Sequence, residues 1–254
     1  PVEILIHDDA STDGTAEIIR EYEKQYPNII KPLYEEENQW IKGRRGSFIF
    51  NIPRARGKYN AFCEGDDYWT DPYKLQKQVD FLESHPEYSM CVHNATIHYE
   101  DGKFPDSLFT KTDKNFVITT EDLICRWSFA TATILCQRSL MKELQEILSL
   151  HDIYHTDWFL ALMLSLKGPI KHLSDIMSVY RKHHLERYSG TELFYLNKKI
   201  EVLEIFDQIS DNLFHDLIIK QINIAKKLAL RKLLSTKMPF VRYVYRCLKN
   251  IFIS

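Results

Sequence analysis

Residues 2–15 read VEILIHDDASTDGT and contain the pattern that decides the fold. The run at residues 2–6 is mostly apolar and then passes into polar residues, as in a short strand buried in a parallel sheet. Asp13 is the expected N-cap of the helical pattern that follows, and Pro27 marks the end of that helix. A second apolar run covers residues 29–33. Strand, helix and strand in this order predict an α/β fold.

The composition is that of an ordinary globular protein. The chain has 254 residues, of which 44% are apolar and 27% charged. That suits one large domain, or one domain with an appendage, and excludes a disordered or fibrous chain. No run of about 18 apolar residues occurs, so no transmembrane helix is expected. The five cysteines include no Cys-x-x-Cys pair, which favours buried thiols in a reducing compartment over a disulfide framework or a zinc site.

The net charge of −2 hides an uneven distribution. Residues 217–254 contain nine Lys or Arg and no Asp or Glu, whereas the segment 1–216 contains 24 basic and 35 acidic residues. An acidic body suits divalent cations, and a basic tail with interleaved aromatic residues suits an anionic membrane surface. The tail is expected to lie on such a surface as an amphipathic helix or, equally, to dock on the domain with a solvated basic face. The acidic body would repel phosphate, so no nucleic acid partner is expected.

The remaining elements follow from apolar periodicity and from turn residues. Asp71 and Pro72 are the expected cap and first residue of a helix that His85 and Pro86 end. Residues 103–118 have no clear pattern and are expected to form a loop. Further strands are expected at residues 58–63, 88–99, 132–136, 170–173 and 176–181, and further helices at residues 47–56, 139–148 and 156–166, after residue 120 and from residue 192 onward.

Two pairs of adjacent carboxylates each follow an expected strand. Asp8 and Asp9 end the first strand, and Asp66 and Asp67 follow the strand at residues 58–63. In open α/β sheets, ligands bind at the carboxyl ends of the strands. Adjacent carboxylates repel each other, and a divalent cation or hydrogen bonds from a ligand relieve that repulsion. Either pair alone would also fit a polar turn before a capped helix, so the functional interpretation depends on their occurrence at two strand ends.

Other residues are candidates for the same site. Asp157 begins an apolar helix, where an aspartate can also simply complement the helix dipole. His183 and His184 follow the last expected strand, and neutral imidazole is a common metal ligand, although such pairs are often surface residues. Arg45 could bind phosphate or lie on a solvated loop. The aromatic residues that could stack on a sugar, but that are expected in the core, are Trp69, Trp127 and Trp158.

The segments that carry the carboxylate pairs resemble those of a known family. Residues 3–15, EILIHDDASTDGT, resemble the nucleotide-binding signature of family 2 glycosyltransferases, which have the GT-A fold. Residues 64–75, EGDDYWTDPYKL, resemble that family's metal-binding motif of the DXD type. The resemblance covers residues 1–190. It implies a Rossmann-like α/β domain with a mixed, mostly parallel sheet flanked by helices, followed by a helical, basic extension at residues 191–254.

The resemblance also implies a role for each candidate residue. Asp9 would bind the nucleobase of a nucleotide sugar, and Asp66 would hold its ribose or the donor sugar. Asp67 would bind Mn²⁺ or Mg²⁺, which bridges the diphosphate, and His183 would be a further metal or diphosphate ligand. Asp157 lies where the family has its catalytic base. The other residues assigned to nucleotide-sugar binding are Ser11 and Arg45.

Two departures from the family pattern are visible. Thr156 stands where the family often has a glutamate, which leaves the base intact but removes the preceding acidic contact. The residues after His183 read HLE, where a Gly-rich stretch often follows.

The implied reaction is an inverting transfer of a sugar from a nucleotide-diphosphate sugar to an acceptor hydroxyl. The acceptor would be a glycan or a lipid-linked molecule, as in the assembly of surface polysaccharide or glycolipid. The resemblance places the protein in the cytoplasm, at the inner face of the membrane if the basic tail binds lipid. Two other interpretations stay open: a non-catalytic nucleotide- or sugar-binding module of the same fold would need no base at Asp157, and a nucleotidyltransferase shares the broad architecture.

The family ordinarily has a strand and a helix before the segment that opens this chain. The resemblance therefore predicts that this sequence lacks those elements and leaves an inner strand edge unpaired. Reduced stability and weak activity are the expected consequences. Restoring the upstream elements is expected to raise the melting temperature.

Overall fold

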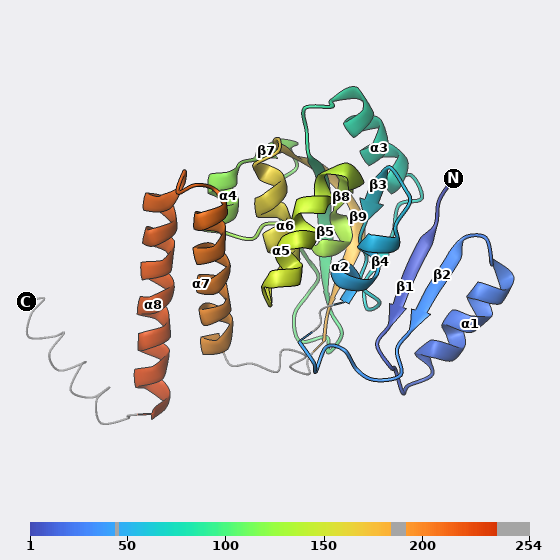
Figure 1. The fold of residues 1–254 in the computed structure, drawn as a ribbon, viewed down its shortest axis with the longest axis horizontal. Helices are drawn as coiled ribbons and strands as arrows, with labels where there is room; N and C mark the ends of the chain where they lie inside the picture. Colours follow the sequence, from blue (N-terminus) through green and yellow to red (C-terminus); the bar gives the residue numbers. More distant parts are fainter. Residues whose placement is uncertain (44–45, 184–191, 238–254) are drawn as a thin grey trace, which may run out of the picture.

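The computed structural model describes residues 1–43, 46–183 and 192–237 (Figure 1). A seven-stranded sheet separates a large apolar core on one face from a smaller one on the other. Helices α4 (Thr120–Cys125), α5 (Lys142–Leu150) and α6 (Thr156–Ser165) cover the face with the large core. Helix α3 (Lys74–Ser84) covers the other face.

The first elements confirm the expected strand, helix and strand. Strands β1 (Ile4–Asp8) and β2 (Ile30–Tyr34) pair in parallel, and α1 (Thr15–Gln25) joins them. These two strands form a sheet of their own beside the seven-stranded sheet (Figure 1). The N-cap of α1 is Gly14, with a φ of 86°, and not Asp13 as expected. Asp13 instead accepts hydrogen bonds from the backbone N–H and the hydroxyl of Thr15, which fixes the turn just before the helix.

The expectation of a mostly parallel sheet is wrong. The seven-stranded sheet has the order β3-β8-β5-β9-β4, with β6 beside β5 and β7 beside β9. Within the described residues, the pair of β5 (Met90–Tyr99) with β9 (Ile170–Lys182) is the one parallel pair of this sheet. Its other pairs are antiparallel: β6 follows β5 after a short connection, whereas the other short strands pair with segments far away in the chain. The short strands are β3 (Tyr59–Ala61), β4 (Tyr68–Trp69), β6 (Ser107–Leu108), β7 (Phe116–Ile118) and β8 (Leu135–Gln137).

Some other element boundaries also differ from the expected ones. Residues 103–118, expected as a loop, contain the short strands β6 and β7. The two strands expected at residues 170–181 form one strand, whose register to β5 shifts at a bulge near Asn94. The helix expected at residues 47–56 divides into α2 (Gly46–Phe50) and a 3₁₀ turn at Ile52–Arg54, because Pro53 has no N–H to donate within a continuous helix.

Helix α3 begins at Lys74, three residues after the expected cap. Asp71 accepts a hydrogen bond from the backbone N–H of Tyr73 at 2.7 Å and so shapes a turn before the helix instead of capping it. Helix α4 begins with a capping box, in which Thr119 and Asp122 exchange side-chain and backbone hydrogen bonds.

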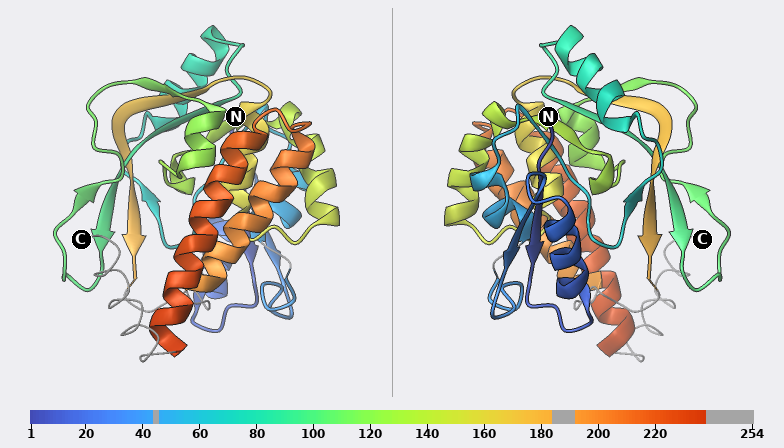
Figure 2. Two further views of the ribbon diagram at one scale, coloured as in Figure 1. Left: turned by 90° about the vertical axis from the view of Figure 1, so that its left-hand side faces the viewer. Right: turned by 90° about the vertical axis from the view of Figure 1, so that its right-hand side faces the viewer.

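The C-terminal region is helical, as expected. Helices α7 (Glu192–Ile209) and α8 (His215–Lys237) run antiparallel and side by side (Figure 2). Ile200 and Phe206 of α7 and Ile218 of α8 belong to the same apolar core as α6, so this hairpin packs on the sheet domain. No helix in the described segments is long and apolar enough to cross a bilayer. The expected domain boundary at residue 190 lies outside the described residues.

Gly168, in the turn between α6 and β9, is a point of close backbone approach. A Cβ added there would lie 2.3 Å from the carbonyl oxygen of Glu87. Ser89, which precedes β5, donates its N–H to Pro169 and its hydroxyl to Gly168. The turn therefore fixes the starting points of β5 and β9 side by side.

Gly168→Ala is expected to destabilise the protein by about 2 kcal/mol or more, because the backbone of residue 87 must move. The melting temperature should fall by roughly 4 °C or more. Gly65→Ala is the matched control, since a Cβ at that residue meets nothing within 4 Å. Equal melting temperatures for the two variants would contradict this account.

Candidate active site

The turn at residues 64–67, between β3 and β4, is the centre of the candidate site. Strand β4 pairs antiparallel with the end of β9, so this turn lies against the residues that follow β9. Asp67 accepts a hydrogen bond from the backbone N–H of Arg181 at 2.9 Å through Oδ1. The Nε2 atom of His183 lies 3.5 Å from Oδ2 of Asp66. The fold thus brings together three of the residues that the sequence identified.

Two ligand-type atoms of this turn are buried without a hydrogen bond. They are Oδ2 of Asp67 and Nε2 of His183. Buried polar atoms are normally satisfied, so two unsatisfied ones in one site indicate a missing partner. A carboxylate oxygen and an imidazole nitrogen are both suitable ligands of a divalent cation such as Mn²⁺ or Mg²⁺.

The described residues contain no group of three or more His, Cys, Asp or Glu side chains that could hold a metal on their own. That agrees with the usual binding of Mg²⁺, which takes one or two protein ligands and completes its shell with substrate phosphates and water. The residues present therefore fit a cation that binds together with a diphosphate.

The pKa of Asp67 is raised to about 6. Burial is the main cause, the N–H of Arg181 lowers the pKa, and the neighbouring charge of Asp66 raises it again. The ionised form of Asp67 is thus disfavoured in the protein alone. A bound cation would favour that form and offset the cost of its burial.

Asp157 lies in the first turn of α6, next to the same turn. Its Oδ2 accepts a hydrogen bond from the hydroxyl of Thr131 at 3.0 Å, and its Oδ1 accepts the backbone N–H of Trp158 at 2.8 Å. Thr131 comes from the 3₁₀ turn at Thr131–Thr133, which precedes β8. These two bonds hold the carboxylate in one orientation.

Glu64 is the residue whose importance the sequence did not reveal. Its pKa is raised to about 8, mainly by burial of the carboxyl group and then by the charge of Asp157, while the hydrogen bond from the Thr131 hydroxyl lowers it. The Glu64 carbonyl oxygen accepts the N–H of Asp67 at 3.1 Å, so Glu64 links Asp157 to the Asp66–Asp67 turn. Its position in the EGDD motif was a usable signal, whereas nothing in the sequence pointed to Thr131.

A buried lysine packs against β4, the strand that follows the turn. Lys74 is 1% exposed, and its Nζ donates to Gln78 and lies 4.1 Å from the ring centre of Trp69. Burial lowers the pKa of Lys74 to about 7. The Trp69 ring in turn donates its Nε1–H to the carbonyl of Ala132. Trp69 therefore has a structural contact although it is 37% exposed, and Trp158, at 6%, belongs to the core as expected.

Asp9 lies at the end of β1 and holds a neighbouring loop. Its carboxylate accepts the backbone N–H groups of Gln39 and Trp40 at 2.6 and 3.0 Å. The Trp40 ring contacts the ring of Tyr154, with centres 6.0 Å apart, three residues before Asp157. Asp9 is thus connected to the region of Asp157 indirectly: it binds the loop that carries Trp40, and Trp40 contacts Tyr154. Ser11 is exposed in the segment after β1, and Arg45 lies outside the described residues.

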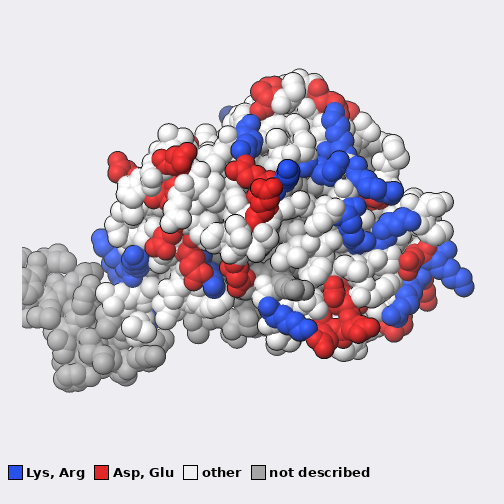
Figure 3. Space-filling model, viewed as in Figure 1, with Lys and Arg blue, Asp and Glu red and all other residues white. Residues whose placement is uncertain are grey.

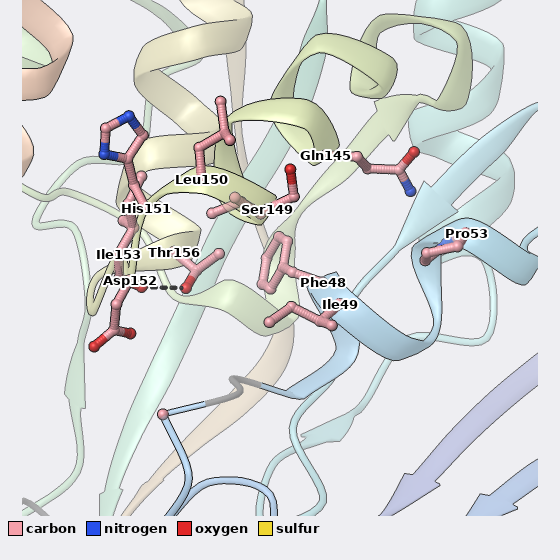
Figure 4. Close-up of a pocket in the computed structure, with 12 residues that line it drawn as sticks. Phe48, Ile49, Pro53, Gln145, Ser149, Leu150, His151, Asp152, Ile153 and Thr156 are labelled. Atoms are coloured by element: carbon pink, nitrogen blue, oxygen red, sulfur yellow. Dashed lines mark hydrogen bonds between the residues drawn. The ribbon is translucent and has the colours of Figure 1, made fainter.

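A pocket of about 590 Å³ opens beside α6 (Figure 4). Its apolar wall includes Phe48, Ile49 and Leu148, and its polar residues include Gln145 and Ser149. Thr156, which directly precedes Asp157, lines one end, and its hydroxyl donates to the carbonyl of Ile153 (Figure 4).

Comparison with known proteins identifies the family of the chain. The family model described as "Glycosyl transferase family 2" matches residues 1–189. An uncharacterized protein of Mycobacterium tuberculosis is 38% identical over 183 residues, which are 72% of this chain and 51% of that protein. The chain therefore spans about half the length of these curated relatives. The Escherichia coli protein WfaP, named UDP-Glc:alpha-D-GlcNAc-diphosphoundecaprenol beta-1,3-glucosyltransferase, is 25% identical over 203 residues, which are 80% of this chain and 74% of WfaP.

Among solved structures, residues 1–349 of Staphylococcus aureus TarS align with a TM-score of 0.59 at 18% identity. The alignment covers 95% of this chain and 67% of that one. At this identity the likeness supports the fold alone.

Asp67→Asn is expected to stabilise the metal-free protein at pH 8, by on the order of 1 kcal/mol after solvent screening, or about 3 °C in melting temperature. The folded pKa of about 6 lies above the model value of 3.8. The cost of ionising Asp67 in the folded protein therefore develops as the pH rises from about 4 to about 6 and is fully present above that pKa, so the difference between the proteins should shrink as the pH falls through this range and be small near pH 4.

The same variant should lose the rise in melting temperature that Mn²⁺ with a nucleoside diphosphate gives the original protein. Asp113→Asn, in an exposed loop, is the matched control. An Asp67→Asn protein that still gains stability from Mn²⁺ and UDP, GDP or dTDP would remove Asp67 as a ligand.

Proposed function

The chain belongs to glycosyl transferase family 2, and from this premise we propose that it transfers a sugar from a nucleotide-diphosphate sugar to an acceptor hydroxyl, with inversion and with a divalent cation. One observation carries the proposal. A carboxylate with a fixed orientation, Asp157, stands beside a turn whose Asp67 and His183 each present an unsatisfied ligand atom. The donor and the acceptor would meet between these two groups.

Asp67 and His183 are the residues that would hold the cation, here Mn²⁺ or Mg²⁺. When bound, the cation neutralises negative charge that grows on the leaving diphosphate. Asp66, whose Oδ2 lies 3.5 Å from His183, is placed to hold the ribose or the donor sugar. Because Asp66 and Asp67 are adjacent, the same turn would position both the sugar and the diphosphate.

Asp157 would accept the proton of the attacking hydroxyl. The Thr131 hydroxyl and the Trp158 N–H orient its carboxylate toward one direction of attack. Glu64 has a pKa of about 8 and is therefore largely protonated at pH 7, so it does not compete as a base. Two neighbouring carboxyl groups with different protonation states are typical of acid–base assignments in active sites.

The nucleotide would bind at the end of β1. Asp9 orders the loop at residues 38–40, whose Trp40 is 45% exposed and so offers an aromatic face next to the site. Ser11 follows on the same segment, and Arg45 is assigned to the donor phosphates from its sequence context.

The acceptor would approach from the side of Asp157. The pocket beside Thr156 has an apolar wall and a few polar groups, as sites for small ligands commonly do. WfaP, by its name, acts on a sugar linked to diphosphoundecaprenol. We therefore place this protein in the assembly of surface polysaccharide or glycolipid, with a lipid-linked or glycan acceptor.

Asp157→Asn is expected to lower turnover by about 10²–10⁴-fold, because the amide accepts no proton, while donor binding stays unchanged. Release of nucleoside diphosphate from UDP-, GDP- and dTDP-sugars with Mn²⁺ measures turnover, and calorimetry measures binding. Asp216→Asn is the matched control, since Asp216 also lies in the first turn of a helix, α8.

An Asp157→Asn protein with full turnover would refute the assignment of the base. Donor binding without turnover by the original protein, with every acceptor preparation, would instead favour a non-catalytic binding module.

A further inference from the structure

The outer face of α8 carries basic and apolar side chains together. The helix buries Ile218, Ile222 and Ala225 against the core. On its other sides Ile219, Ile224, Leu228 and Leu230 are between 39% and 56% exposed. Exposed apolar side chains in such number on one helix suggest a surface that something covers.

The same helix is strongly basic. Between His215 and Lys237 it contains six Lys or Arg residues and one acidic residue. At 100° per residue, Lys220, Lys227 and Arg231 lie on the side opposite the buried residues, with Ile224 and Leu228 directly beside them. None of these three cations forms an ion pair within the described part of the chain, whereas Lys232 pairs with Glu192 of α7.

Helix α8 points in the same direction as the strands that lead to the candidate site. The helix runs toward the end of the molecule at which β1 and β9 also end, as both views in Figures 1 and 2 show. Asp9 and His183 lie at those strand ends. Figure 3 shows Lys and Arg side chains at the left-hand end of the molecule, where Figure 1 has α8. Five of the six basic residues of α8 lie from residue 226 onward, in the half of the helix that points toward the end at which β1 and β9 finish.

We propose that this face of α8, defined by Lys220, Ile224, Lys227, Leu228 and Arg231, binds the surface of a bilayer that contains anionic lipids. Interfacial helices bury apolar side chains near the headgroups while basic side chains contact lipid phosphates. Each basic residue near an anionic surface strengthens partition by about fivefold, equivalent to about 1 kcal/mol. Three such cations on one face are then enough to direct the protein to such a membrane.

The distribution of charge along the chain favours a bilayer over a nucleic acid as the partner of α8. The region from residue 217 onward contains nine basic and no acidic residues, whereas the segment 1–216 as a whole carries 24 basic and 35 acidic side chains. A nucleic acid long enough to extend past α8 would come close to the acidic segment 1–216, which would repel its phosphates. A fluid bilayer can present anionic headgroups to α8 alone and also accept its apolar side chains. The proposal concerns binding only and does not depend on which sugar is transferred.

Co-sedimentation of the full chain with vesicles tests the proposal. The original protein is expected to bind vesicles of about two parts phosphatidylcholine to one part phosphatidylglycerol, to release at high salt, and to bind pure phosphatidylcholine far more weakly. The combined variant Lys220→Gln, Lys227→Gln, Arg231→Gln should lose about 100-fold in partition. The combined variant Ile224→Ser, Leu228→Ser should lose about tenfold.

A matched variant controls for net charge. Lys24→Gln, Lys111→Gln, Lys114→Gln removes the same charge from exposed positions elsewhere and should bind as the original protein does. Circular dichroism and melting temperature confirm that all variants fold. Unchanged binding by the α8 variants, an equal loss in the control, or equal binding to both kinds of vesicle would each overturn the proposal. Binding to a DNA duplex but not to the anionic vesicles would overturn it as well.

Discussion

The parallel pairing of β5 with β9 is the interaction on which the rest of the structure depends. It extends from Met90 opposite Ile170 to Tyr99 opposite Lys182. Helices α4, α5 and α6 lie between these two strands in the chain, so the pairing also closes the large core. Strand β4 then pairs with the last part of β9, and this places the Asp66–Asp67 turn against Arg181 and His183. The site is a consequence of where β9 ends.

Several ionisable groups at the candidate site and in the core have pKa values shifted toward the uncharged form, because burial of the ionisable group disfavours its charge. Burial raises the pKa of Asp67 and Glu64 and lowers that of Lys74. It also lowers the pKa of His93 to about 3 and of His172 to about 4, so both imidazoles stay neutral in the core. The histidines lie within the sheet, away from the proposed chemistry. The carboxylates, in contrast, face the place where a cation would bind, so their burial cost is one that a ligand can relieve.

Local patterns in the sequence predicted local structure well. The strand–helix–strand unit at the N-terminus and the helices of the C-terminal region are present because they depend on apolar periodicity within one segment. The prediction that α3 starts directly after Asp71 is wrong, because Asp71 accepts a hydrogen bond from the N–H of Tyr73 and forms a turn before the helix. The sequence does not distinguish this turn from a helix cap. The sheet was misjudged for a different reason. Short strands such as β6 and β7 exist only because another strand lies beside them, β5 next to β6 and the distant β9 next to β7, and two or three residues carry no periodic signal.

In the candidate site, too, residues in local motifs were predicted and residues that depend on long-range contacts were not. Asp66, Asp67 and His183 were identified from motifs, and the fold brings them together. Thr131 was not identified, because its partner Asp157 lies 26 residues away and a threonine alone carries no signal. The assignment of Asp9 to a nucleobase stays a prediction, since the structure has its carboxylate on the backbone of the loop at residues 38–40.

In the proposed site, a cation with only two protein ligands would make the binding of metal and of nucleotide interdependent. Asp67 and His183 would leave most positions around such a cation open, and Asp66 beside them would add a further negative charge. A cation alone would then bind weakly, and a diphosphate alone would meet two carboxylates. Together they would stabilise each other, because phosphate oxygens can complete the coordination shell of a cation and a cation would screen the carboxylates. The proposed reaction therefore begins from a site that is electrostatically unfavourable when empty, and this same feature disfavours occupation by either ligand without the other.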